Sequence, residues 1–175
     1  KKQLANTNMQ VVINEQKIEA TSDTIESVAT ASESYAKIAD WADKTHIGGY
    51  GELHYNDKNG SDNQVDAHRF VLYVEHEFTD DVRFFSEVEL EHSIAGDGQN
   101  GEVELEQAYI EWDYTNNHSA TFGQFLIPIG LMNETHEPDA FYGVERNSVE
   151  KNIIPATWWE IGVMLGGEIA PGLSC

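Results

Sequence analysis

Three short segments of this 175-residue chain place glutamate at every second position, with an uncharged residue between. They lie at residues 75–77, 87–91 and 102–106. Successive side chains of a β-strand point to opposite faces of a sheet, so a period of two predicts strands with one acidic and one apolar face. A soluble sandwich buries its apolar face, whereas a transmembrane barrel turns that face to lipid and lines a water-filled lumen with polar groups.

Six antiparallel strands are expected, near residues 47–55, 68–78, 82–92, 102–114, 119–125 and 158–164. The alternation in the fourth strand slips after Gln107, which predicts a bulge or a change of parity. The connections are alternately long and short, at residues 56–65, 79–81, 93–101, 116–117 and 126–157. Outer-membrane barrels have long outward loops and short periplasmic turns, whereas a sandwich spaces its turns evenly. The loop lengths therefore favour an all-β transmembrane antiparallel β-barrel, with its strands in residues 46–175.

Residues 1–43 differ from the rest, because they lack glycine and proline. Apolar residues recur there every seven positions, at Leu4, Val11, Ile18 and Ile25. The second core position, three residues after each of them, is polar in three of four cases. This pattern predicts a helix that forms a short parallel coiled coil, for which a homotrimer is the expected assembly. An ordinary amphipathic helix packed on its own domain is the alternative.

The formal net charge of −21 argues against nucleic acid as a partner, because nucleic acid binding needs basic patches. No stretch approaches the roughly 18 consecutive apolar residues of a membrane helix. No nucleophile–base motif, phosphate loop or nucleotide fingerprint is present, so neither an enzyme nor a cofactor is predicted. The seven histidines lack metal-ligand spacing, so no metal site is predicted.

Several consecutive strings in the second half of the chain are similar to those of a known family. They are FLIPIGL at 125–131, NETHEP at 133–138, FYGVERN at 141–147 and VEKNIIPATWWE at 149–160. Together with GEVELEQAYIEW and IGGYGELHYN earlier in the chain, they resemble the phosphate-selective porin O/P family over about residues 46–165. The resemblance implies a 16-stranded, trimeric porin of the bacterial outer membrane, with the N-terminal coiled coil in the periplasm.

The chain departs from this family's pattern in two ways. Phosphate-selective members attract anions with arginines and lysines, whereas the inward positions here are mostly glutamate. In addition, six strands cannot close a barrel, because even the smallest barrels need about eight. The chain is therefore expected to be the N-terminal portion of a longer protein.

The alternation assigns a set of residues to the lumen of the barrel. These pore-lining candidates are Glu52, Arg69, Tyr73, Glu75, Glu77, Arg83, Glu87, Glu89, Glu91, Glu104 and Glu106. Rows of carboxylates attract cations and repel anions, so a channel for passive diffusion of small ions and solutes with cation preference or weak selectivity is predicted. The alternative is a soluble or surface β-domain on a coiled-coil stalk, with a role in adhesion or carbohydrate binding.

The long third loop, at about 126–157, carries aromatic residues and charges of both signs. The third loop of porins commonly folds into the lumen and narrows it. The constriction candidates here are Glu134, His136, Glu137, Asp139, Glu145 and Arg146. Burial of Phe141, Tyr142, Trp158 and Trp159 is expected to offset the entropy lost when such a loop becomes ordered. A loop that points outward is the alternative.

Overall fold

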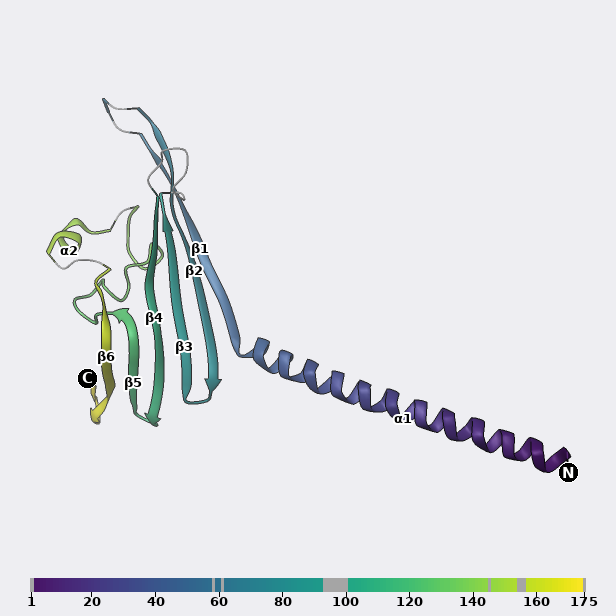
Figure 1. The fold of residues 1–175 in the computed structure, drawn as a ribbon. Helices are drawn as coiled ribbons and strands as arrows, with labels where there is room; N and C mark the ends of the chain where they lie inside the picture. Colours follow the sequence, from purple (N-terminus) through teal and green to yellow (C-terminus); the bar gives the residue numbers. More distant parts are fainter. Residues whose placement is uncertain are drawn as a thin grey trace. The chain divides into compact units, whose positions relative to one another are not determined.

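A computed structural model describes residues 2–57, 59–60, 62–92, 101–144, 146–153 and 157–174. The chain divides into two compact units, Lys1–Asp43 and Lys44–Cys175. The first unit is a helix and the second is built on an antiparallel sheet (Figure 1).

The helix α1 runs without interruption over Lys2–Asp43, which confirms the predicted helix. Its threonine hydroxyls donate to the carbonyl four residues earlier, as from Thr21 to Lys17 at 2.7 Å, so these residues are accommodated within the helix. The apolar residues of the heptad pattern, among them Ile18 and Ile25, are exposed. None of the helices in the described ranges is long and apolar enough to cross a membrane.

Seven strands follow one another in the sheet in the order of the sequence, each antiparallel to its neighbours (Figure 1). Their bounds are β1 Thr45–Asn56, β2 Gln64–Thr79, β3 Val82–Glu91, β4 Glu102–Thr115, β5 His118–Leu126, β6 Trp159–Ala170 and β7 Leu173–Ser174. The sheet is open, with β1 and β7 at its edges. The six predicted strands are present, although β2 begins four residues earlier than expected and β6 extends six residues further. The two-residue β7 was not predicted.

The connections at the two ends of the sheet differ in length. Short turns at residues 80–81, 116–117 and 171–172 lie at one end, and the longer connections join the strands at the other (Figure 1). The connection between β3 and β4 falls largely outside the described residues. The longest connection, 127–158, contains the short helix α2 at Ser148–Ile153, which was not predicted. Asn147 caps α2, because its side-chain oxygen accepts from the backbone N–H of Val149 at 2.9 Å.

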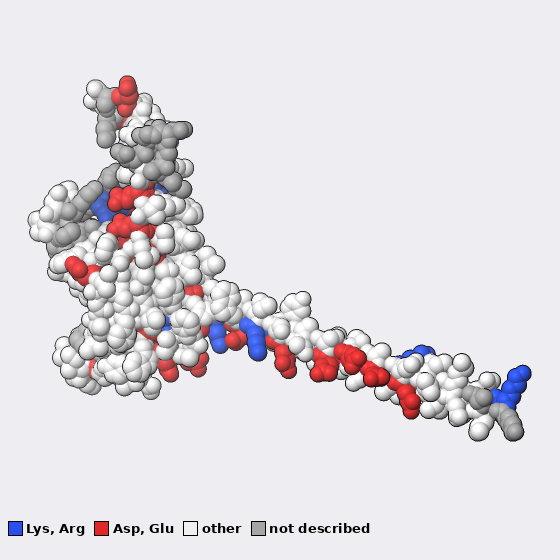
Figure 2. All heavy atoms as spheres, in the orientation of Figure 1, with Lys and Arg blue, Asp and Glu red and all other residues white. Residues whose placement is uncertain are grey.

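One face of the sheet, here called the apolar face, is exposed although it is hydrophobic. Its exposed side chains include Ile47, Leu53, Phe70, Leu72, Val103, Leu105, Ile110, Phe122, Ile161, Val163 and Leu165. Figure 2 shows a broad surface of uncharged side chains over the strands. The apolar residues that are almost completely buried, by contrast, are few: Val71, Ala120, Phe125 and Leu126 in the described part of the chain.

The register of the strands shifts beside each of the three short turns and at two further places, and these two are the bulges that bear on the site. In the β1–β2 pair the register shifts after Glu52, which leaves His68 as an extra residue before Arg69. In the β3–β4 pair Glu87 lies opposite Gln107 and the next residue lies opposite Leu105, so Glu106 is the extra residue. The parity change that the sequence predicts at Gln107 is therefore confirmed as a β-bulge.

Gly123 of β5 lies at a close approach of two strands and provides a test of this register. Its φ is +135°, and a Cβ atom there would lie 2.3 Å from the carbonyl oxygen of Ala108. Gly123→Ala is expected to destabilise the sheet by about 1–3 kcal/mol, because both backbone strain and a steric clash oppose the methyl group. Urea-induced unfolding of the full-length protein measures the loss.

The matched control is Gly162→Ala, because Gly162 pairs directly with Gly123 but has no atom within 4 Å of a built Cβ. This variant is expected to unfold at the same urea concentration as the unmodified protein. Equal stability of the two alanine variants would contradict the close approach of β4 and β5.

Candidate functional site

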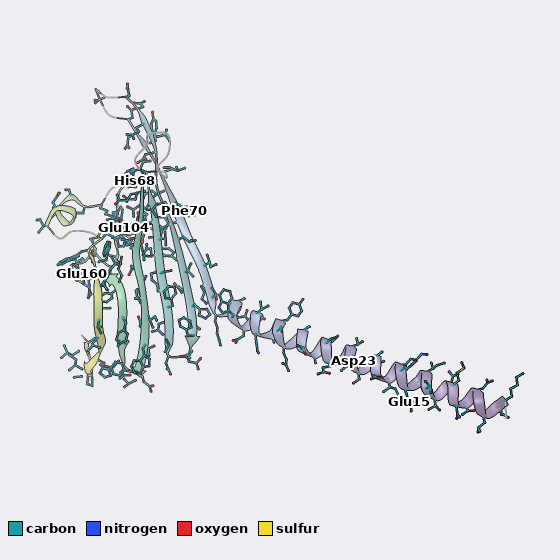
Figure 3. The ribbon with its side chains drawn as sticks, viewed as in Figure 1. Glu15, Asp23, His68, Phe70, Glu104 and Glu160 are labelled. Atoms are coloured by element: carbon teal, nitrogen blue, oxygen red, sulfur yellow. The ribbon has the colours of Figure 1, made fainter. Side chains whose placement is uncertain are left out.

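The pore-lining candidates share the face opposite the apolar face, here called the acidic face. The strand register links them in rows, such as Tyr73 opposite Glu87, Glu77 opposite Arg83, and Glu89 opposite Glu104. Glu52 joins the same face through its pairing with Arg69, and Glu106 joins it through the bulge. Glu104 lies on β4 toward the end of the sheet at which the long connections lie (Figure 3). All eleven candidates are therefore brought together on one face.

The connection 127–158 packs onto the acidic face and is closed at its base by Asn133. The buried amide of Asn133 donates to the carbonyl oxygens of Ile127 at 2.6 Å and Trp158 at 2.8 Å, and accepts from the Trp158 N–H at 2.7 Å. Arg146 donates to the hydroxyl of Thr157, whose φ of +67° is strained for a β-branched residue. These bonds fix the start and the end of the connection against each other.

His136 is a deeply buried anchor of this connection, at 2% exposure. Its Nδ1 lies 2.9 Å from the carbonyl oxygen of Asn133, and its Nε2 lies 3.0 Å from Oε1 of Glu106 and 3.7 Å from Oε1 of Glu137. Both ring nitrogens thus face acceptors, which favours the imidazolium form. Burial alone would lower the pKa of His136, but the carboxylates of Glu106 and Glu137 outweigh it and raise the pKa above its usual value.

Glu137 is the second anchor. Its carboxylate accepts hydrogen bonds from the hydroxyls of Tyr50 in β1 and Tyr73 in β2, the latter at 3.1 Å. Glu87, Glu137 and His136 each bring a ligand-type atom to within 4.8 Å of the others. Consecutive residues of the connection, 136 and 137, therefore bind it to three strands of the sheet.

Arg69 holds three of the predicted lumen carboxylates at the same end of the sheet. Its guanidinium forms ion pairs with Glu52 at 3.2 Å, Glu89 at 3.0 Å and Glu91 at 3.3 Å. The arginine is 8% exposed and Glu89 is 4% exposed. Buried carboxylates need a nearby cation to offset the loss of hydration, and Arg69 supplies it.

The part of the acidic face nearer the short turns has a different character. Glu75 and Glu77 are exposed there, and Arg83 pairs with Glu111 and, at 2.9 Å, with Asp113. A row of rings crosses the first four strands between the two parts, formed by Tyr50, Tyr73, Phe85 and Tyr109, with neighbouring centroids 6.4, 6.0 and 5.3 Å apart. The acidic face thus has a covered half, in which Arg69 and His136 lie close to several carboxylates, and an uncovered half, in which Glu75 and Glu77 are exposed.

The other constriction candidates do not share the role of His136 and Glu137. Glu134 and Asp139 are exposed, and Glu145 lies outside the described residues. The expected burial of aromatic residues is only partly correct. Phe141 and Trp159 are half-buried, but Tyr142 is fully exposed and Trp158 is 37% exposed. Tyr142 needs no burial partner, since exposed apolar side chains are common on protein surfaces.

Sequence reasoning missed a cluster of histidines on the same face. His54 stacks on His68 with ring centroids 4.1 Å apart, and His68 meets the ring of His92 edge-on at 5.1 Å. These rings border a cavity of about 250 Å³ that Arg69 and Arg146 also line. The spacing of Asp66 and His68, two residues apart in one strand, could have indicated that they share a face. The approach of His92 to them, however, depends on how β3 pairs with β2.

The pairing of His136 with Glu106 predicts that docking of the connection depends on pH. The pKa of His136 is raised when the connection is docked. The ion pair therefore stabilises the docked state fully below about pH 6.5, the ordinary pKa of histidine, and this stabilisation is lost as the pH rises through the raised pKa. Limited proteolysis of residues 127–158 in the full-length protein should therefore become faster at alkaline pH.

His136→Gln is expected to remove this pH dependence and to give rapid cleavage throughout. The matched control is His118→Gln, because His118 pairs with a hydroxyl, that of Thr115 at 3.0 Å, and touches no residue of the connection in the described contacts. An unchanged pH profile in His136→Gln would show that another group controls docking.

The sequence profile of the family described as phosphate-selective porin O and P matches residues 23–157. A curated relative from Aquifex aeolicus (strain VF5), described as an uncharacterized protein, is 42% identical over 125 residues, which cover 70% of this chain and 29% of the relative. The chain thus spans under a third of that relative's length, and no solved structure matches. The chain belongs to the phosphate-selective porin O and P family.

Proposed function

We propose that this sheet forms part of a transmembrane β-barrel in the bacterial outer membrane, with the acidic face toward a water-filled lumen. The observation that carries the proposal is the inversion of the sheet: the apolar face is exposed, while the opposite face holds the charges and the docked connection 127–158. Lipid contact would remove the apolar face from water, and an aqueous lumen would solvate the free carboxylates. The strands described here would be completed to about 16 by a longer protein, consistent with the 29% of the relative that the chain spans.

The helix α1 would then lie in the periplasm and hold three copies together. The short turns, which face the periplasm in outer-membrane barrels, lie at the end of the sheet at which β1 begins. The exposed residues Leu4, Ile18 and Ile25 are available for a coiled-coil seam. The polar residues at the second core position would make this seam weak, and the barrel walls would contribute most of the trimer contact.

The pore would allow passive diffusion of small ions and solutes, with cation preference or weak selectivity. An anion site needs a guanidinium or ammonium group that is not already neutralised. Among the strand residues of the acidic face that the structure describes, Arg69 is surrounded by three carboxylates and Arg83 by two. Glu75 and Glu77 have no basic partner among the ion pairs of the described residues, so their charges would act on passing ions.

Selectivity tests this proposal directly. Reversal potentials of the full-length protein in planar bilayers under a salt gradient should show cations favoured. The double variant Glu75→Gln/Glu77→Gln should lower the cation-to-anion permeability ratio severalfold, because two uncompensated lumen charges are lost.

The control is Glu15→Gln/Glu26→Gln, which makes the same change of charge in α1 and should leave the ratio unaltered. A clear anion preference in the unmodified pore would overturn the proposed selectivity and favour transport of phosphate-like anions.

Conductance tests the position of the connection. Deletion of residues 137–147 removes the Glu137 anchor and the segment that follows it, and should increase single-channel conductance if the connection narrows the lumen. Tyr50→Phe/Tyr73→Phe, which removes only the two hydroxyl donors to Glu137, should give a smaller increase with more frequent fluctuations between levels. Unchanged conductance in the deletion variant, with the protein still folded and heat-resistant on a gel, would place the connection outside the pore.

A further inference from the structure

We propose that Asp66, His68 and His92 form a binding site for a divalent transition-metal ion such as Zn²⁺. Asp66 and His68 lie two residues apart in β2, and the backbone N–H of His92, just after β3, donates to the carbonyl oxygen of His68 at 2.9 Å. Oδ2 of Asp66 lies 3.2 Å from Nδ1 of His68 and 2.9 Å from Nδ1 of His92. Figure 3 shows His68 toward the end of β2 at which the long connections lie.

The spacing of these three atoms suits a metal ion. Bonds of about 2.0–2.1 Å to nitrogen and oxygen in a tetrahedral site place neighbouring ligand atoms about 3.3 Å apart. The distance from Asp66 to His68, 3.2 Å, is close to this value, that to His92, 2.9 Å, is shorter, and all three ligand atoms lie within 4.8 Å of one another. A small rotation of the His92 side chain, which is 51% exposed, would bring the imidazoles together.

The donor set favours a transition metal over Mg²⁺ or Ca²⁺. Two imidazoles and one carboxylate suit Zn²⁺, Ni²⁺ and Cu²⁺, whereas the harder cations prefer oxygen ligands alone. Three protein ligands leave a coordination position for water, as in exchangeable rather than closed structural sites. The proposed ion is therefore one that binds and leaves at the edge of the cavity.

The charges around Asp66 support this assignment. Arg69, the nearest guanidinium along β2, forms its ion pairs with Glu52, Glu89 and Glu91. Within the described part of the chain, the ion pairs of Asp66 are with the two imidazoles alone. Two neutral imidazoles could each donate an N–H to the Asp66 carboxylate, but neither would bring a positive charge. A bound metal ion would supply the positive charge that this carboxylate lacks.

The bulge in β2 is what aligns the ligands. It places His68 on the acidic face beside Arg69 and stacks it on His54, so the ring is held by a neighbour in β1. His92 adopts a φ of +52°, which ends β3 and leaves its side chain beside Asp66. Because the ligands come from β2 and from the residue that follows the adjacent β3, the site does not depend on closure of a barrel or on transport.

Zn²⁺ titration of the full-length protein in competition with a chromophoric chelator tests the site. Asp66→Asn, His68→Gln and His92→Gln should each weaken Zn²⁺ binding by at least about 10-fold. Substitution of residues that merely hydrogen-bond to a metal ligand already causes a loss of this size. Excess Mg²⁺ should not compete. The matched control is His118→Gln, because His118 belongs to no cluster of three ligand-type residues in the described ranges.

A second measurement uses the unmodified protein and so does not depend on the folding of variants. Zn²⁺ should protect His68 and His92, but not His118, from diethyl pyrocarbonate, as read by mass spectrometry of peptides. Equal reactivity of His68 and His92 with and without Zn²⁺ would overturn the proposal. Loss of binding in His136→Gln alone would also overturn it, because it would move the ion to the cluster of Glu87, His136 and Glu137.

Discussion

The buried carboxylate of Glu106 and the imidazole of His136 are the contact on which the rest of the site depends. Glu106 is 1% exposed and His136 is 2% exposed, and their atoms approach to 3.0 Å. A charge removed from water is costly unless an opposite charge and hydrogen bonds replace its hydration. The connection 127–158 needs the acidic face to compensate its imidazolium, and the acidic face needs the connection to compensate its carboxylate.

This mutual dependence explains how a long connection is ordered with little apolar burial. The described chain buries only four apolar residues almost completely, and two of them, Phe125 and Leu126, lie at the end of β5, just before the connection. Position is instead specified by directional contacts: Asn133 at the base, His136 toward β4 and Glu137 toward β1 and β2. Hydrogen bonds and ion pairs restrict geometry more narrowly than apolar contact does, which suits a segment that must hold a defined position over a charged surface.

The sequence was sufficient to predict the strands, their two faces and the long connection, because a period of two is a local property. It was insufficient where the outcome depends on register between strands. Asp66 was placed outside its strand, so its approach to His92 could not be predicted. The six-residue α2 and the two-residue β7 are too short to show a period. The first bulge could have been predicted, because the consecutive polar residues His68 and Arg69, between Ala67 and Phe70, interrupt the alternation of the strand.

The two bulges solve the same geometric problem. A regular strand gives each face one residue in two, which limits how many polar groups one face can carry. Each bulge places two consecutive polar residues on the acidic face: His68 with Arg69, and Glu106 with Gln107. Gln107 donates to Glu87 at 2.8 Å, while Glu106 remains free to meet His136. On either side of each bulge, the residues of the apolar face keep their alternation. The bulges therefore increase the number of polar contacts beneath the connection without adding a polar residue to the face that we propose meets lipid.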